Sequence, residues 1–417
     1  MNPSNNSSDW KPLLDVSSPG RILFLKKLSE IAETLLTHLP TFKSNNGIVS
    51  DRVGAVLFLF YYAKFMNDDK YAQIAFDLIS MVFDELSNEI ADGRLSSGSD
   101  GLAGVGWTLE HLAQNDFLEI DTNEMLGEID IFLYETMLKN MEKREYDYLN
   151  GALQKGLYFL SRRGNRQTSV YLSHLVDVLE KVAEKDKDGG LKFLSRVPDD
   201  GGGESYVCNL GMAHGMPSIA WFLGKLLDLD IARDKVTGLL NAFVSYIFKH
   251  FQDTSVRISH FPGWVIGESS PADSRLAWCF GDPGLGIGLW QASGSCGNKD
   301  WEKMITDVLL HSTGRRDLEK NAVVDAGMCH GTVGLAHIYN RMFHYTGIKN
   351  FEDAALYWLD ETLKMATFKD GYAGFKRYHS QWINSADIFD GISGIGLALL
   401  AAVSDSEPRW DRMMMMS

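Results

Sequence analysis

A glycine-rich turn recurs along the whole chain, and this repeat constrains the fold more than any other feature. Aligned on the pattern x-Gly-x-x-Gly followed by an apolar run, its copies are anchored at positions 51, 101, 151, 215, 281, 331 and 391. The first copy is weak, and Gln154 and Ser218 replace the second glycine in the third and fourth copies. Self-similarity at intervals of 50 to 66 residues is typical of stacked or circular units that share one core.

The segments on either side of each turn differ in their hydrophobic pattern. Apolar residues upstream recur at helical spacing, as in Ile22, Leu25, Leu28, Ile31 and Leu35, which predicts a helix buried on one face. Segments downstream, such as 53–60, 219–227 and 392–403, are apolar nearly all round and should be buried on every side. Seven such pairs predict fourteen helices with few strands. We expect an all-α fold, an (α/α) toroid or barrel of seven outer/inner helix pairs.

Length and composition place this fold in a broad class of proteins. Because all repeats share one core, we expect a single domain over residues 1–417, with flexible tails at 1–16 and 408–417 that include the Met413–Met416 run. The N-terminus lacks the pattern of a secretory signal, and no apolar run is long enough to span a membrane, so we expect a cytoplasmic protein. A net charge of -15 argues against nucleic-acid binding.

Two cysteines and two histidines occupy matching positions of the repeat. Cys279 and Cys329 lie two residues before the first glycine of successive turns, and His214 and His330 take the next position in their turns. Equivalent positions of neighbouring repeats come together, so Cys279, Cys329 and His330 predict a zinc site with a fourth position open. Buried, inert thiols are the alternative. Cys208 and Cys296 fall outside this pattern.

An open position on such a zinc ion would suit a substrate thiol. A coordinated thiol is deprotonated at neutral pH, whereas a free cysteine is mostly protonated there. If the sulfur then adds to an activated alkene, the enolate that forms must be protonated, and His214 is a candidate acid. A core histidine is the alternative for His214. We expect His337 to be a packing residue and Asp282 to cap the helix that follows it.

Three segments of the sequence also resemble a known family, independently of the argument from metal and thiol chemistry. GMAHGMP at 211–217, SRLAWCFGDPGLG at 274–286 and MCHGTVGLAHIY at 328–339 resemble the LanC-type lanthionine synthetase cyclases, as does the sevenfold layout. The resemblance implies Cys279, Cys329 and His330 as zinc ligands and His214 as a proton-transfer residue. It also matches Arg275 and Asp147 to family positions.

The roles of those two matched residues stay open at this point. Arg275 could orient the partner of the imidazole or hold the enolate oxygen. Asp147 could accept the thiol proton or hold His214. Surface salt bridges are the alternative for both residues.

The expected function is a zinc-dependent cyclase that adds cysteine thiols to dehydroalanine or dehydrobutyrine and so forms thioether rings. Its partners would be a dehydrated precursor peptide, a separate dehydratase and a membrane-associated transporter complex, with no nucleic acid. One alternative is a LanC-like protein that binds or transfers glutathione, and another is a non-catalytic, zinc-containing peptide-binding scaffold. A glycosidase that uses Asp100 and Asp390 is a further rival. The intervals on either side of the fourth repeat are longer and contain extra loop, including 199–204 and 260–264. This extra loop indicates substrate contact, and a solvated insertion is the alternative.

Overall fold

The chain forms fourteen α-helices within the residues that the computed structural model describes, which are 10–42, 50–91, 99–149, 151–162, 164–198, 204–267 and 273–417. Three small antiparallel sheets, β1–β2, β3–β4–β5 and β6–β7, accompany them. Contacts divide the chain into two compact units, one made of residues 1–92 and 323–417 and the other of residues 93–322. The expectation of one domain over residues 1–417 stays a prediction.

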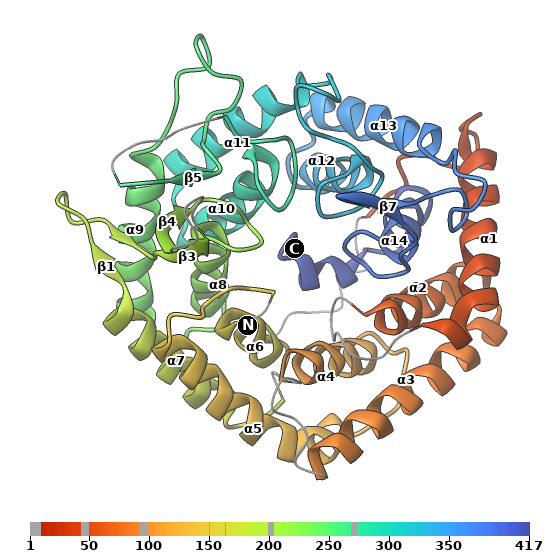
Figure 1. Cartoon of the computed structure of the whole chain (residues 1–417), viewed down its shortest axis with the longest axis horizontal. Helices are drawn as coiled ribbons and strands as arrows, with labels where there is room; N and C mark the ends of the chain where they lie inside the picture. Colours follow the sequence, from red (N-terminus) through yellow and green to blue (C-terminus); the bar gives the residue numbers. More distant parts are fainter. Residues whose placement is uncertain are drawn as a thin grey trace. The chain divides into compact units, whose positions relative to one another are not determined.

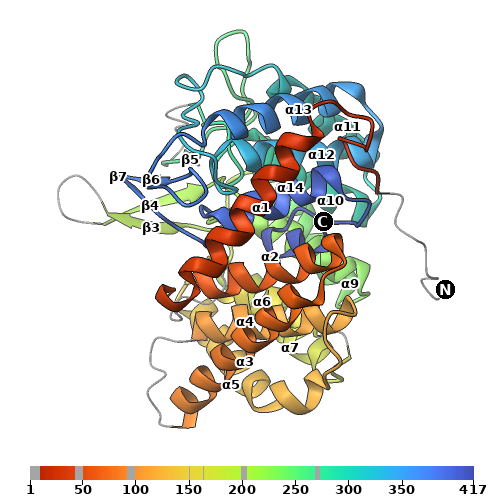
Figure 2. The same cartoon turned by 90° about the vertical axis from the view of Figure 1, so that its right-hand side faces the viewer.

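The first unit combines the two ends of the chain. Its elements are α1 (Arg21–His38), η1 (Leu39–Thr41), α2 (Asp51–Met66), α3 (Asp69–Ala91), α12 (Thr332–Thr346), α13 (Lys349–Lys364), β6 (Arg377–His379), β7 (Gln381–Ile383), α14 (Ile392–Val403) and η3 (Arg409–Met414). Helix α14 packs against α1, α2 and α12 (Figures 1 and 2). All twelve of its residues are buried, whereas α1 and α13 bury only one face.

The second unit is continuous in sequence. Its elements are α4 (Ser99–Gln114), α5 (Thr122–Glu142), α6 (Ala152–Ser161), α7 (Thr168–Val182), β1 (Glu184–Lys185), β2 (Leu191–Lys192), β3 (Ser195–Pro198), β4 (Glu204–Asn209), α8 (Met216–Asp228), α9 (Arg233–Phe248), β5 (Trp264–Val265), α10 (Asp282–Cys296) and α11 (Lys299–Thr313). Helices α4, α6, α8 and α10 pack in succession, and α5, α7, α9 and α11 cover them (Figure 1).

The glycine turn has the same backbone hydrogen bond in several copies. The N–H of the residue after the first glycine donates to a carbonyl seven residues upstream, from Ala152 to Glu145, from Thr332 to Asp325 and from Ile392 to Ser385, at 2.9 to 3.1 Å. A Cβ on Gly331 would collide with backbone atoms of this segment, and one on Gly334 would collide with the carbonyl of Met328. Close backbone approach therefore explains why glycine recurs at this spacing.

Neighbouring turns are joined at equivalent positions, as the repeat predicts. The N–H of Ala213 donates to the carbonyl of Cys279, and the N–H of Cys329 donates to the carbonyl of Phe389, at 3.4 and 2.8 Å. In both bonds, donor and acceptor lie two residues before the first glycine of their turns. These bonds bring the side chains two residues and one residue before the first glycine close to the side chains at the same positions in the bonded turn.

Parts of the segments that were expected to be flexible tails make buried contacts in the described chain. Met413–Met416 are buried at the end of the chain, and η3 holds the buried Asp411, which binds His337 and Arg341. Trp10 is also buried, and its Nε1 donates to the carbonyl of Ala401. A network of buried charges and aromatic rings fixes segments whose composition looked like that of tails. Residues 1–9 lie outside the described part of the chain.

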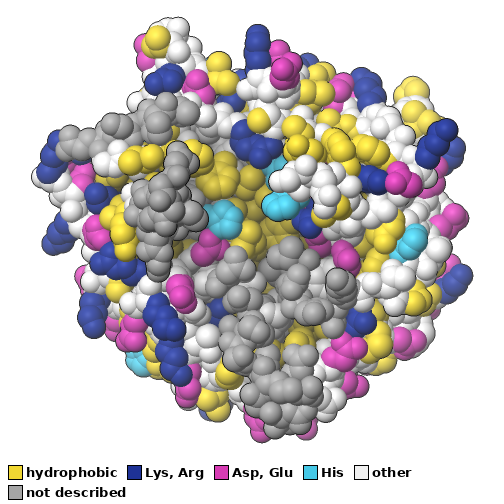
Figure 3. All heavy atoms as spheres, in the orientation of Figure 1, with side chains coloured by type: hydrophobic (Ala, Val, Ile, Leu, Met, Phe, Trp, Pro, Cys, Tyr) yellow, Lys and Arg dark blue, Asp and Glu magenta, His cyan; other side chains and the backbone are white. Residues whose placement is uncertain are grey.

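Charged side chains of both signs are interspersed on the face of the molecule in Figure 3. In the described part of the chain, no helix is sufficiently long and apolar to cross a bilayer.

Candidate active site

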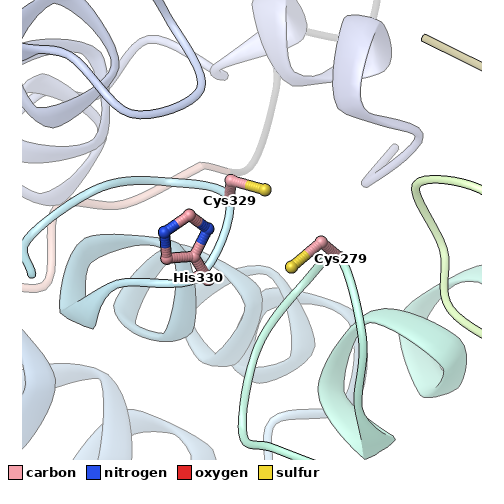
Figure 4. A group of neighbouring side chains, drawn as sticks. All are labelled: Cys279, Cys329 and His330. Carbon is pink, nitrogen blue, oxygen red and sulfur yellow. The ribbon is translucent and has the colours of Figure 1, made fainter. Parts of the chain in front are cut away.

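The side chains of Cys279, Cys329 and His330 form a group of neighbouring ligand atoms (Figure 4). One atom from each residue, two thiol Sγ atoms and an imidazole nitrogen, lies within 4.8 Å of the other two. Cys279 precedes α10, and Cys329 and His330 precede α12, so each comes from a glycine turn. These are the same three residues that the repeat singled out.

The donor set fits a zinc ion. Zinc held tetrahedrally at about 2.3 Å from sulfur and about 2.0 Å from nitrogen would place its ligand atoms about 3.5 to 3.8 Å apart. The three ligand atoms lie within 4.8 Å of one another, which exceeds that spacing by at most about 1.3 Å. Thiolate and imidazole are soft and borderline ligands, which favour zinc over magnesium or calcium. Three protein ligands leave a fourth position for a substrate atom.

Asp325 holds the imidazole of His330. Its carboxylate is fully buried and lies 3.5 Å from Nε2 of His330. It also accepts the N–H groups of Gly327 and Tyr378, at 3.0 Å each. Burial would raise the pKa of Asp325, but the hydrogen bond from His330 and those two N–H groups outweigh it, and the pKa is lowered. The other ring nitrogen, Nδ1, lies on the side of the two thiols in Figure 4.

Asp390 adds a second carboxylate beside the same imidazole. Its Oδ1 lies 3.7 Å from Nδ1 of His330, and its Oδ2 accepts from Arg377 at 3.2 Å. Burial, together with the charges of Asp387 and Asp325, raises the pKa of Asp390 to about 6. Oδ1 is buried and has no hydrogen-bond partner among the described residues. This excess of buried negative charge is a further reason why a cation fits here.

His214 pairs with Asp147 through Nδ1, whereas His330 faces Asp325 through Nε2. Nδ1 of His214 and Oδ2 of Asp147 form a short hydrogen bond, and about a third of each side chain is exposed. Burial alone would lower the pKa of His214, but the hydrogen bond and charge of Asp147, with a smaller effect from Cys279, outweigh it and raise the pKa above 6.5. A histidine held in this way keeps its proton to higher pH than a free imidazole does, and it can give that proton to a carbanion.

Arg275 is fixed to the loop that follows α11. One of its terminal nitrogens, Nη2, donates to the carbonyl of Ala322, while Nε is buried without a partner among the described residues. The centroid of the Phe280 ring is 6.0 Å from that of His214, and Phe280 lines the same cavity as Arg275. Asp147, His214 and Arg275 therefore all belong to the second unit, near Cys279.

The other cysteines and His337, which the sequence analysis left outside the site, have packing contacts rather than a place in the site. Cys208 is buried against the sulfur of Met216, and burial raises the pKa of its thiol to about 12. Cys296 lies half-buried at the end of α10. His337 is buried and bonded to Asp411, which confirms it as a packing residue.

The prediction that Asp282 caps α10 is wrong. The N-cap residue is Gly281, and no side chain caps this helix. Instead, the buried carboxylate of Asp282 accepts the N–H groups of His260 and Phe261, at 2.9 and 3.0 Å, and so anchors the preceding loop. Burial raises the pKa of Asp282 to about 6. The side chain of Asp100 lies outside the described residues.

Sequence reasoning missed Asp325. The residue lies five positions before His330, and Asn209 lies five positions before His214. Both bind the N–H two residues further along, that of Gly327 in one turn and that of Gly211 in the other. An Asp or Asn followed two residues later by glycine is a recognisable signal for this turn. The signal does not tell a carboxylate that only builds the turn from one that also holds a ligand.

Comparison with known proteins agrees with this fold. A family model described as lanthionine synthetase C-like protein matches residues 45–415. The chain belongs to this family. A solved structure titled "Nisin cyclase" is similar over 95% of this chain and 98% of that chain, with a TM-score of 0.73 at 14% sequence identity. At this identity the match shows the fold alone, and it confirms the predicted fold class, the helical toroid.

Proposed function

We propose that this protein is a zinc-dependent cyclase that closes thioether rings in a dehydrated precursor peptide. In the reaction, the sulfur of a cysteine bonds to the β-carbon of a dehydroalanine or dehydrobutyrine, and a proton is added to the α-carbon. The thiol loses its proton and the alkene gains one, so the product is an isomer of the substrate. Membership of the lanthionine synthetase C-like family and likeness to a nisin cyclase support this class of reaction.

The observation that carries the proposal is the combination of two groups. Cys279, Cys329 and His330 would hold the zinc ion, which when bound would supply the acidity that converts a substrate thiol to a thiolate at neutral pH. Next to Cys279 in the repeat, the pair of His214 and Asp147 offers a proton donor. A thiol activator and an acid are the two groups that this addition needs.

Each residue of the second unit has a distinct part in the proton transfer. Asp147 keeps the imidazole of His214 protonated and oriented through Nδ1, so that Nε2 is left to deliver a proton to the α-carbon. Arg275 presents a fixed positive charge to the enolate oxygen that forms as sulfur adds. The alternative role for Asp147, acceptance of the thiol proton, is disfavoured because its carboxylate is already engaged by His214.

Loss of free thiols tests the proposal directly, because ring closure leaves the mass of the peptide unchanged. Purified protein with one equivalent of zinc is incubated with a peptide that contains one dehydroalanine and one cysteine, and the remaining thiol is trapped with a maleimide. We expect enzyme-dependent loss of the maleimide adduct. Persistence of a full adduct at every enzyme concentration would contradict the proposal.

Two further measurements distinguish the cyclase from a glutathione-transferring protein and from a non-catalytic scaffold. Glutathione with a dehydroalanine peptide that lacks cysteine tests for intermolecular addition, which increases the mass by that of glutathione. A scaffold without turnover would bind the cyclisation substrate and leave its thiol free. The preparation of this substrate requires a prior dehydration of serine or threonine, so we also propose a separate dehydratase, with a transporter complex as a further partner and the cytoplasm as the compartment.

A further inference from the structure

A cavity lies beside the candidate catalytic residues and is built from the second unit alone. Its volume is about 340 Å³, within the range of small-ligand pockets. The residues that line it are Gly263, Trp264, Asp273, Ser274, Arg275 and Phe280. Phe280 directly follows the candidate ligand Cys279, so a ligand in this cavity would lie next to the reacting atoms.

Two aromatic rings form an apolar wall of the cavity. Trp264 and Phe280 meet edge to face, with centroids 6.2 Å apart, and Phe280 in turn faces the ring of His214. Trp264 is 46% exposed, which is unusual for the largest apolar side chain. Such a ring is available to cover an apolar group of a ligand.

The loop that carries Trp264 is held in place. The carbonyl of Gly263 accepts the N–H of Leu210, and Trp264 pairs with Asn209 where β5 joins β4. Upstream, Asp282 binds the N–H groups of His260 and Phe261. The exposed tryptophan is thus presented by a fixed backbone, which lowers the entropic cost of binding.

Two residues that line the cavity, Ser274 and Arg275, carry buried polar groups without partners among the described residues. Ser274 is 4% exposed, and its hydroxyl has no hydrogen-bond partner among the described residues. Its backbone, in contrast, is fully used: the N–H donates to Ser259 and the carbonyl accepts from Arg315. Nε of Arg275 is likewise unpartnered. Buried donors are seldom left unpaired, so these two groups indicate an acceptor supplied by a ligand.

We infer that this cavity is a subsite for one residue of the precursor peptide, next to the reacting position, and that it selects an apolar side chain. The side chain would lie against Trp264 and Phe280, and the main-chain carbonyl of the same residue would accept from Ser274 and Arg275. An apolar wall with two carbonyl-directed donors matches one residue of a peptide. The inference rests on the proposed function for the identity of the peptide.

Binding of unreactive peptides tests the subsite without turnover. Serine replaces the cysteine and alanine replaces the dehydroalanine, and the residues that flank the alanine are either phenylalanine or glycine. With zinc-loaded wild-type protein, we expect the phenylalanine peptides to bind about 10-fold more tightly than the glycine peptides in fluorescence anisotropy. Trp264→Ala should remove this preference, so that the phenylalanine and glycine peptides bind with similar affinity.

Two further variants control the measurement. Ile266→Ala removes an equally exposed apolar side chain two residues away that does not line the cavity, and we expect it to keep the preference. Ser274→Ala should weaken both peptides alike, by about 2- to 10-fold. Thermal unfolding curves check that each variant is folded.

The subsite and the proposed function can fail separately. Equal affinity for phenylalanine and glycine peptides in the wild type, or an unchanged preference in Trp264→Ala, would overturn the subsite even if rings are formed. An unchanged affinity in Ser274→Ala would overturn the carbonyl contact. A Trp264-dependent preference in a protein that leaves every thiol free would support the subsite and contradict the cyclase.

Discussion

His214 and His330 occupy the same position of the glycine turn, directly before the first glycine, yet their carboxylate partners come from different places. His330 lies beside Asp325, five residues upstream in its own turn, through Nε2. At the matching upstream position, the turn of His214 has Asn209, and the carboxylate comes from Asp147 in the preceding repeat and binds Nδ1. In each case the partner decides which ring nitrogen is left for chemistry.

This difference teaches how one backbone turn can serve two chemical roles. Asn209 and Asp325 bind the same N–H of their turns, so the turn itself needs an oxygen acceptor and no charge. The charge of Asp325 is therefore available for the imidazole of His330, which has Nδ1 on the side of the thiols. A supporting carboxylate is a common feature of histidines that bind metals. His214 is more exposed and has its Nε2 left for proton transfer.

Loss of a thiol should have the largest effect. We expect Cys329→Ala to reduce bound zinc from about one equivalent to near zero by elemental analysis, because three ligands are the fewest that hold a catalytic zinc ion. His214→Asn is the matched control and should retain the zinc. If Cys329→Ala keeps a full equivalent of zinc, the assignment of the metal site to this group is wrong.

Removal of the acid should affect the rate and leave the metal in place. For His214→Asn we expect ring closure to slow by about 10²- to 10⁴-fold, the usual contribution of a positioned general acid, with zinc content unchanged. The measurement is the rate of thiol loss under saturating peptide. A variant that is as fast as the wild type would show that another group protonates the α-carbon.

Removal of the supporting charge should have an intermediate effect. Asp325→Asn keeps an oxygen for the N–H of Gly327 and replaces the other carboxylate oxygen, which faces Tyr378 and His330, by an amide nitrogen. We expect it to lower zinc affinity by about 10- to 100-fold in a chelator competition. Asp51→Asn is the control, since this carboxylate also binds a backbone N–H, that of Ala386, in the same unit. Equal zinc affinity in the two variants would place Asp325 among the purely structural residues.

The pH profile should show the smallest effect. An acid acts only while protonated, so the rate should fall as pH rises through the raised pKa of His214. Asp147→Asn removes the charge that raises this pKa, leaves only a weaker, neutral hydrogen-bond acceptor, and keeps the burial that lowers the pKa. We therefore expect the falling limb of the rate profile to move to lower pH. If the falling limb stays at the same pH, the titrating acid is a group other than His214.

Much of the fold and part of the site could be predicted from the sequence because they follow from the repeat. The alternation of one-sided and fully apolar segments predicted the fourteen helices, and the matched positions predicted that Cys279, Cys329 and His330 come together. The contact of Asp147 with His214 joins residues 67 positions apart, and the resemblance alone left two roles for Asp147. Pairings between turns depend on side-chain direction, which spacing does not give.

Local composition failed where long-range contacts decide the structure. The run Met413–Met416 looked like a tail, but Asp411 beside it neutralises Arg341 and bonds to His337 in α12, which fixes the segment. Asp282 looked like a helix cap, but the turn already places glycine at that position and leaves the carboxylate to the loop at 260–261. In both cases a charged residue had a partner far away in the sequence.

The discontinuous composition of the first unit has a consequence for synthesis on the ribosome. Helix α14 packs on α1 and α2, and Trp10 and Arg21 bond to the carbonyls of Ala401 and Val403. The early helices therefore have no partner until about 330 to 390 more residues have been made. At about 5 to 20 residues per second, this delay is roughly 20 to 80 s. The 93–322 unit emerges as one stretch in the meantime. Nascent α1 to α3 therefore expose apolar surface during translation, and chaperone protection of this segment would raise the yield of folded protein.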